Sequence, residues 1–152
     1  MKSGNNIWER IDTALVIVNY TALDELKKYR EAIRDSGLNV NNCELLAIVE
    51  DKKEREILSH QSIATFISDK DLNFLGQLKN ASALKIVGRK YDVLFFLGDP
   101  PKRLHKVFAK TTRKLSVGVN CTKNEQNVNL ETEDNSPSHL INFARQTLQK
   151  II

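Results

Sequence analysis

The sequence predicts a three-layer α/β domain with a mainly parallel sheet of about five strands. Two apolar runs, 13–18 and 91–97, show almost no polar alternation, which is typical of strands buried on both faces. Segments with helical periodicity separate the apolar runs, and alternating strands and helices favour parallel pairing through right-handed crossovers. The 152 residues fit one domain, 1–152. We therefore expect a single Rossmann-like domain.

The first half of the chain supplies three of the expected strands. Run 13–18 is expected at the centre of the sheet, and Thr21 is expected to cap a helix that stops at Gly37. Run 43–49 is the second strand and should lie parallel to the first. Segment 51–56 has mixed charge and is expected to be exposed, whereas 64–68 reads as a short strand at a sheet edge.

The second half repeats the same alternation. A helix over 81–89 precedes the strand 91–97, and a basic amphipathic helix over 102–114 leads to a strand over 115–120. Alternation at 128–132 predicts a last, half-exposed strand. Ser136 and Pro137 mark the start of a closing helix, because proline is well tolerated at the first helical position.

Composition excludes several classes of protein. With 41% hydrophobic and 28% charged residues, the chain is neither disordered nor fibrous. The two cysteines, Cys43 and Cys121, form no CxxC pair, so we expect free thiols. The start of the chain, 1–6, is not followed by an apolar segment typical of secretion, and the apolar runs are too short to span a membrane. We expect a cytoplasmic protein without membrane contact.

The sequence nominates no catalytic residue, metal site or cofactor. The glycine-rich dinucleotide fingerprint is missing, because no glycine occurs between Asn5 and Gly37. His60, His105 and His139 stand alone in the sequence, without a second histidine or a carboxylate at ligand spacing. No Ser/His/Asp or Cys/His arrangement is evident.

Charge is unevenly distributed along the chain. Segment 77–123 has a net charge of +9, whereas the rest has a net charge of −5. At about 100° per residue, the basic side chains of the expected helix fall within an arc of about 120°. This predicted anion-binding or partner-binding face comprises Lys102, Arg103, Lys106, Lys110, Arg113 and Lys114.

A cationic face of this kind favours an anionic partner: RNA, a ribonucleoprotein or an acidic protein. Specific readers of single-stranded RNA also expose aromatic side chains for stacking, but Phe95, Phe96 and Phe108 read as core. The alternative is a solvated outer helix with no partner. We expect a non-enzymatic binding protein.

A second candidate site follows from the expected architecture. Ligands of open parallel sheets bind beyond the carboxyl ends of the strands, and the 98–101 turn leads into a helix N-terminus that would favour an anion. The alternative interpretation is a purely structural strand-to-helix turn. The candidate pocket comprises Asn19, Tyr20, Thr21, Gly98, Asp99 and Asn120.

Several segments resemble a known family of small proteins. KYDVL at 90–94, KLSVG at 114–118 and DKDLNFLG at 69–76 are similar to an uncharacterised family from Bacteroidetes bacteria. VIVNYTALD at 16–24 more distantly resembles the N-terminal half of heptosyltransferase-type glycosyltransferases, in which a strand is followed by an Ala-Leu-Gly-Asp turn. Ala22, Leu23 and Asp24 match this turn, but the glycine before the aspartate is absent. That resemblance implies a related fold. The alternative function is therefore a small enzyme or enzyme-derived domain that binds a phosphorylated or sugar-nucleotide ligand at the strand ends.

Overall fold

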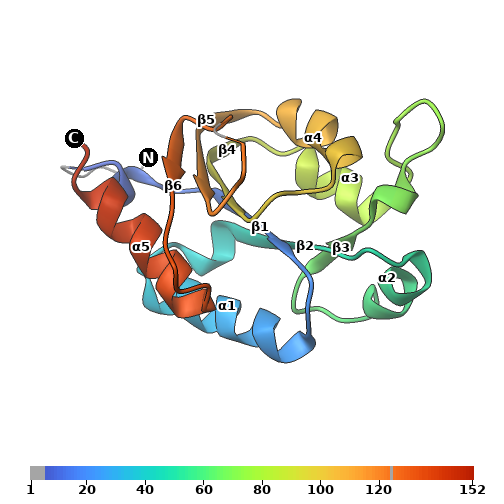
Figure 1. Ribbon diagram of the computed structural model, residues 1–152, viewed down its shortest axis with the longest axis horizontal. Coiled ribbons are helices and arrows are strands. Elements are labelled where there is room, and N and C mark those ends of the chain that lie inside the picture. Colours follow the sequence, from blue (N-terminus) through green and yellow to red (C-terminus); the bar gives the residue numbers. More distant parts are fainter. Residues whose placement is uncertain (1–5, 124) are drawn as a thin grey trace.

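A six-stranded parallel sheet organises the protein (Figure 1). The computed structural model describes residues 6–123 and 125–152. The strand order is β3-β2-β1-β4-β5-β6, and every neighbouring pair is parallel. The elements are β1 (Ala14–Asn19), α1 (Leu23–Asp35), β2 (Cys43–Ile48), α2 (Lys52–Leu58), β3 (Thr65–Ile67), α3 (Ala81–Val87), β4 (Tyr91–Leu97), α4 (Lys102–Ala109), β5 (Arg113–Val119), β6 (Val128–Leu130) and α5 (Pro137–Gln149).

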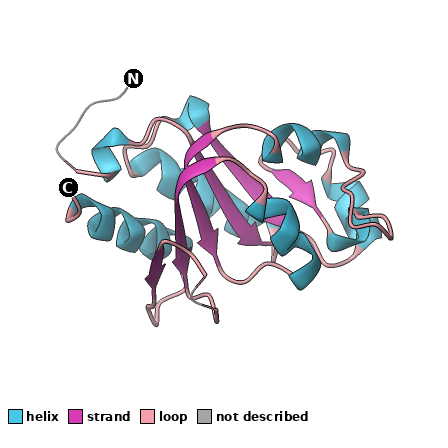
Figure 2. Cartoon of the chain, turned by 90° about the horizontal axis from the view of Figure 1, so that it is seen from above, coloured by secondary structure: helices cyan, strands magenta, loops and turns pink. Residues whose placement is uncertain are grey.

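Helices cover both faces of this sheet (Figure 2). Buried residues of α1 and α5 belong to one hydrophobic cluster, and those of α3 and α4 belong to a second cluster. The structure confirms the predicted three-layer, Rossmann-like class. Its six strands are close to the expected number of about five, and the three-residue strands β3 and β6 form the two edges of the sheet.

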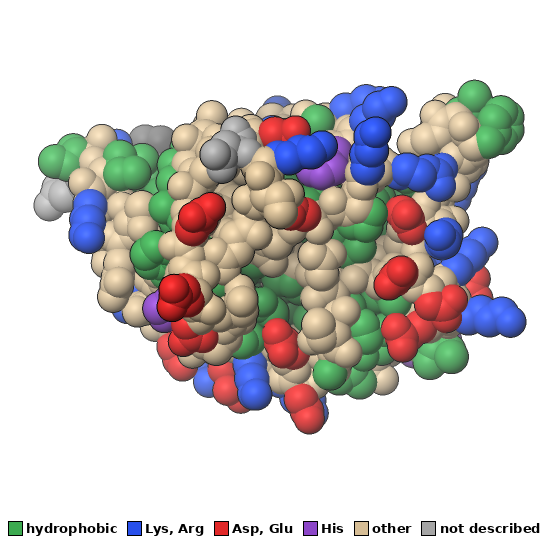
Figure 3. All heavy atoms as spheres, viewed as in Figure 1, with side chains coloured by type: hydrophobic (Ala, Val, Ile, Leu, Met, Phe, Trp, Pro, Cys, Tyr) green, Lys and Arg blue, Asp and Glu red, His purple; other side chains and the backbone are tan. Residues whose placement is uncertain are grey.

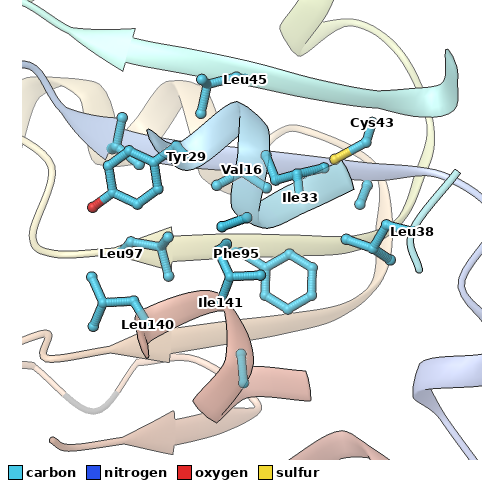
Figure 4. Packing of buried hydrophobic residues seen from close by; sticks show 14 of the residues in the cluster. Val16, Tyr29, Ile33, Leu38, Cys43, Leu45, Phe95, Leu97, Leu140 and Ile141 are labelled. Atoms are coloured by element: carbon cyan, nitrogen blue, oxygen red, sulfur yellow. The ribbon is translucent and has the colours of Figure 1, made fainter. Parts of the chain in front are cut away.

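The central strand β1 shows why the apolar runs are continuous. Val16 and Val18 pack into the cluster with α1 and α5, whereas Leu15 and Ile17 pack into the cluster with α3 and α4. Figure 4 shows Ile33 of α1 and other core side chains gathered around Val16 on the first of these faces. Each large apolar side chain buried in this way contributes about 1.5–3 kcal/mol, so both faces of the strand must be apolar.

Most predicted elements form close to their expected positions. β1 pairs with β2 and with β4, and β4 pairs with β5 as expected for adjacent strands. The predicted edge strand appears as β3, and the last half-exposed strand appears as β6. The helix before β4 and the closing helix with Pro137 at its start are also confirmed.

The helices in the first half of the chain differ from the expectation in two details. Thr21 does not cap α1, because the N-cap residue is Ala22, which makes no side-chain hydrogen bond to the first turn. The exposed segment 51–56 is helical: Asp51 accepts a hydrogen bond from the N–H of Glu54 at 3.2 Å and so begins α2. The apolar pattern of this segment is too weak to predict a helix. The Asp51 side chain at the N-cap stabilises the short helix that forms there.

The basic helix is shorter than the sequence predicted. α4 ends at Ala109 with Lys110 as its C-cap, and β5 begins at Arg113, which lies opposite Tyr91 of β4. The N–H of Tyr91 also bonds to the carbonyl oxygen of Thr112 at 2.9 Å. Pairing with β4 therefore prevents residues 112–114 from continuing helix α4.

The expectation that the chain starts without a secretion signal concerns mainly residues 1–5, which lie outside the described residues. Among the described residues, no helix has both the length and the apolar character needed to cross a bilayer. The described residues also hold no group of three or more His, Cys, Asp or Glu side chains placed to bind a metal ion.

Candidate binding groove

The exposed side of α4 carries a row of basic side chains. Leu104 and Phe108 anchor the opposite side in the core, where the Phe108 ring packs edge-on against Phe96 at 5.8 Å between centroids. The prediction that Phe96 and Phe108 are core residues is therefore confirmed. Four basic residues remain exposed on α4 and its C-cap: Lys102, Arg103, Lys106 and Lys110.

Beside α4 stands a projection formed by residues 72–78, drawn in green at the upper right of Figure 1. Leu72 and Leu78 form an antiparallel bridge at its base. Within it, the Asn73 side-chain oxygen accepts from the N–H groups of Leu75 and Gln77, each at 2.9 Å. The turn is thus held by its own hydrogen bonds, and it leaves Phe74 92% exposed and Leu75 67% exposed at the tip.

A buried ion pair anchors the base of this projection. Asp71 is 5% exposed and its carboxylate is paired with the Arg55 guanidinium of α2. The same carboxylate accepts from the N–H of Ser68 at 2.8 Å, while the Asp71 carbonyl accepts from the N–H of Lys79 at 3.0 Å. The chain is therefore fixed on both sides of the projection.

The projection, α3 and α4 enclose a groove of about 960 Å³. Figure 3 shows hydrophobic side chains at the tip and a group of Lys and Arg side chains across a notch. Apolar lining comes from Leu72, Phe74, Leu75, Leu78, Leu84, Val87 and Val107. All charged side chains among the described lining residues are basic: Lys79, Lys102, Arg103, Lys106 and Lys110.

Arg103 connects the two walls of the groove. Its guanidinium donates to the carbonyl oxygens of Asn73 at 3.1 Å and Asp69 at 3.4 Å, which are 30 and 34 residues away in the chain. These bonds hold the start of α4 against the projection. They leave the charge of Arg103 at the groove surface, because carbonyl oxygens carry no formal charge to neutralise it.

Two of the predicted cationic residues lie elsewhere. The Arg113 guanidinium donates to the carbonyl oxygens of Phe108, Ala109 and Thr111 at 2.9–3.1 Å, and so caps the end of α4. Lys114 pairs with the carboxylate of Asp92 at 3.2 Å. The single cationic face predicted over six residues is therefore wrong for Arg113 and Lys114, because both belong to β5.

The strand ends bring together part of the second candidate site. Asn19 donates from its amide to the carbonyl oxygen of Asp99 at 2.9 Å, and the Asp99 carboxylate accepts from the N–H of Thr122 at 3.0 Å. The N-cap residue of α4 is Pro101, so Asp99 does not cap this helix. Gly98 adopts a φ of 117°, and a Cβ there would lie 3.2 Å from the Asn19 amide nitrogen. These hydrogen bonds hold together the end of β1, the turn after β4 and the loop after β5.

The other three residues of that candidate site lie around this core of contacts. Tyr20 is half-buried and packs edge-on against Phe66, while Thr21 is exposed. Asn120 binds the 132–135 loop through Asn135 at 2.7 Å and the N–H of Thr132 at 2.8 Å. The hollow beside Asn120, of about 520 Å³, has Glu131 and Glu133 as its charged lining residues and would repel a phosphate.

Two of the histidines are not isolated in the structure. His139 lies 2.7 Å from the Thr132 hydroxyl and 3.8 Å from the Asp134 carboxylate, and its ring stacks on Phe143. His105 lies 3.7 Å from the Glu125 carboxylate. The sequence could not show these contacts, because both carboxylates come from loops. The Asp134 contact exceeds hydrogen-bond distance, and the arrangement connects β6 to α5.

Phe74 and Leu75 are the site residues that sequence reasoning missed. The signal was present: two large apolar side chains lie between Asn73 and Gly76, both typical turn residues. An apolar pair at the tip of a turn has no core within reach. Exposed apolar side chains that lie together beside a groove are typical of a contact surface.

The family comparison covers nearly the whole chain. A model of a family of unknown function (DUF6913) matches residues 1–151. The chain belongs to this family. Among curated proteins, none matches it. A similar solved structure is the D-arabinose dehydrogenase from Sulfolobus solfataricus, with 12% identity and a TM-score of 0.42 over 95% of this chain. The chain spans 46% of that dehydrogenase.

Proposed function

We propose that this member of the family is a non-enzymatic binding protein whose groove receives an acidic segment of a partner protein. The observation that carries the proposal is the lining itself, in which five basic side chains border an apolar floor. Paired and hydrogen-bonded carboxylates such as Asp71 and Asp92 lie outside the lining. A partner with acidic and apolar side chains would complement both parts of this surface. As part of this proposal, the protein acts in the bacterial cytoplasm.

RNA and ribonucleoproteins are also negatively charged, so the same basic side chains would attract them. Base recognition, however, uses stacking on several exposed aromatic or arginine planes. Phe74 is the aromatic residue of the groove, and the rest of its apolar lining is aliphatic. Aliphatic side chains favour leucine-like groups of a protein over nucleobases, so an acidic protein is the better candidate.

A pull-down from native lysate tests the proposal. The wild type is compared with the triple variant Lys102→Glu, Lys106→Glu, Lys110→Glu, at low and at moderate salt and with nuclease treatment. We expect a captured protein that survives nuclease and is lost from the triple variant, because three reversed charges would repel acidic side chains. Capture that depends on intact RNA would instead identify a ribonucleoprotein partner.

The matched control reverses three exposed lysines outside the groove: Lys28→Glu on α1 with Lys52→Glu and Lys53→Glu on α2. Both variants change the net charge equally, so a general electrostatic effect would weaken them equally. Equal loss from the two variants, or no loss from either, would contradict binding in the groove.

The alternative proposal is a small enzyme or enzyme-derived domain with a phosphorylated or sugar-nucleotide ligand at the strand ends. It is supported by the resemblance to heptosyltransferase-type glycosyltransferases at 16–24. The likeness to small Bacteroidetes proteins implies no activity and favours neither proposal. The Asn19 amide and the Asp99 carboxylate already take part in structural hydrogen bonds, so a ligand there would have to use their remaining donor and acceptor positions. A thermal-shift screen with nucleotide sugars, repeated on Asn19→Ala, tests it: stabilisation of the wild type alone would support this alternative.

A further inference from the structure

We infer that the 72–78 projection is the half of the groove that selects the partner, and that its occupant is an acidic amphipathic helix. In this arrangement, Phe74 and Leu75 hold leucine-like side chains of the helix, and the basic residues of α4 face its carboxylates. The inference rests on the proposed function, because it describes the same acidic segment in more detail. In addition to its acidic side chains, the segment must carry leucine-like side chains that contact Phe74 and Leu75.

The tip residues are exposed without a role in folding. Phe74 is 92% exposed and Leu75 67% exposed, whereas the neighbouring Leu72 and Leu78 are almost fully buried at the base. Large apolar side chains this exposed at the rim of a groove are typical of interaction sites. Since both line the groove, an occupant would remove them from water.

The projection is ordered before any partner arrives. Its backbone is closed by the bond from the Asn73 N–H to the Gln77 carbonyl at 2.9 Å, and its base is fixed by the buried Asp71 carboxylate. The Asn80 side chain also bonds to the carbonyl of Phe66 at 3.0 Å, just after the projection. A prearranged anchor loses little conformational entropy on binding, which favours affinity.

The groove suits a helix better than an extended strand. Its walls are two helices and a turn whose backbone groups largely bond to one another, so an extended peptide would find few free backbone partners. Lys102, Lys106 and Lys110 are spaced four residues apart along α4 and its cap. Residues at this spacing lie on one side of a helix, so they form a row that carboxylates on a partner helix can match.

Fluorescence anisotropy with defined probes tests the inference. The main probe is a labelled peptide of about four helical turns, with leucines at i, i+3, i+4 and i+7 and glutamates elsewhere. A second peptide has serine at each leucine position. A labelled oligouridine and vesicles containing phosphatidylserine are the other probes. The proteins are the wild type, Phe74→Ser with Leu75→Ser, the triple charge reversal at Lys102, Lys106 and Lys110, and Ile57→Ser.

We expect the wild type to bind the leucine peptide at least roughly 10-fold more tightly than the serine peptide. The double serine variant should lose this preference and bind both peptides equally weakly. Charge reversal should abolish binding of both. Ile57→Ser, at a 72% exposed site on α2 outside the groove, should bind like the wild type. Circular dichroism should show unchanged folding, because Phe74 and Leu75 are not core residues.

Separate outcomes would overturn the two proposals. If the double serine variant binds the leucine peptide normally while charge reversal abolishes binding, the projection does not select the partner and the proposed function survives. If neither variant changes binding, or the wild type binds neither peptide, both proposals fail. Tighter binding of oligouridine would identify an RNA surface. Sedimentation with the vesicles, lost from the double serine variant, would identify a membrane-inserting tip.

Discussion

Asp92 joins the amino-terminal ends of three strands. Its carboxylate accepts from the N–H groups of Asp12 at 2.8 Å and Thr13 at 3.1 Å, just before β1, and pairs with Lys114 of β5. Partial burial by itself would raise the pKa of Asp92, but these two N–H groups and the Lys114 ammonium outweigh burial and lower it. The folded protein therefore favours the ionised carboxylate.

The Asp92→Asn variant should be less stable than the wild type by about 1–2 kcal/mol at pH 7, because an amide cannot accept charge-assisted hydrogen bonds. A lowered pKa in the folded state stabilises the protein above the ordinary pKa near 3.8, and this stability is lost as pH falls through the lower folded value. The difference in the free energy of unfolding between Asp92→Asn and the wild type should therefore shrink as the pH falls. Urea unfolding at pH 7, 4 and 2.5 measures it, and a constant difference over this range would contradict the role of the charge.

At the scale of an element, α4 is a helix of 8 residues whose end is fixed by a residue of the next strand. The Arg113 side chain bonds to three carbonyls at the C-terminus, where the helix dipole is negative. Carbonyls at this end have no partner within the helix. The cation that sequence periodicity assigned to the binding face instead stabilises the element that carries this face.

We expect Arg113→Ala to destabilise the protein by about 1–2 kcal/mol, because it removes both the hydrogen bonds and the charge from the end of α4. Lys110→Ala, at an exposed site three residues earlier, should change stability by less than about 0.5 kcal/mol. Thermal unfolding of the two variants measures this contrast. In the peptide-binding assay, Lys110→Ala should weaken binding more than Arg113→Ala does, since Lys110 lines the groove and Arg113 does not.

At the scale of the whole molecule, one sheet separates two hydrophobic layers. Trp8, the only tryptophan, is buried in the layer with α1 and α5, where its ring lies 6.0 Å from Phe95 and its indole N–H bonds to Ser36. The other layer contains α3, α4 and the base of the projection. Because alternate residues of the same strands belong to both layers, we expect neither layer to remain packed without the other.

Urea unfolding followed by Trp8 fluorescence should therefore coincide with unfolding followed by far-ultraviolet circular dichroism. Fluorescence reports on one layer, while circular dichroism reports on the helices of both. A loss of helical signal before the fluorescence change would show that the α3 and α4 layer unfolds separately. That result would contradict the single cooperative domain expected for residues 1–152.

The amino-acid sequence by itself determined the α/β class, the positions of most strands and helices, and the basic character of α4. These properties depend on local patterns: a strand covered on both faces is apolar at every position, and a helix covered on one face is apolar at every third or fourth position. This is why β1, β4 and α5 were predicted closely, and why the edge strand β3 was recognised from only a few residues.

The tertiary structure alone decided what lies beside what. Arg113 belongs to β5 instead of the predicted helix, because it pairs with Tyr91 in the sheet. Asn19 bonds to Asp99, which lies 80 residues away in the chain. The groove depends on the same kind of contact, since Arg103 holds α4 against a turn 30 residues earlier in the chain. Periodicity describes a residue relative to its own element, whereas a binding surface depends on contacts between elements. Sequence therefore predicted the basic row, and only the fold placed the exposed Phe74 opposite it.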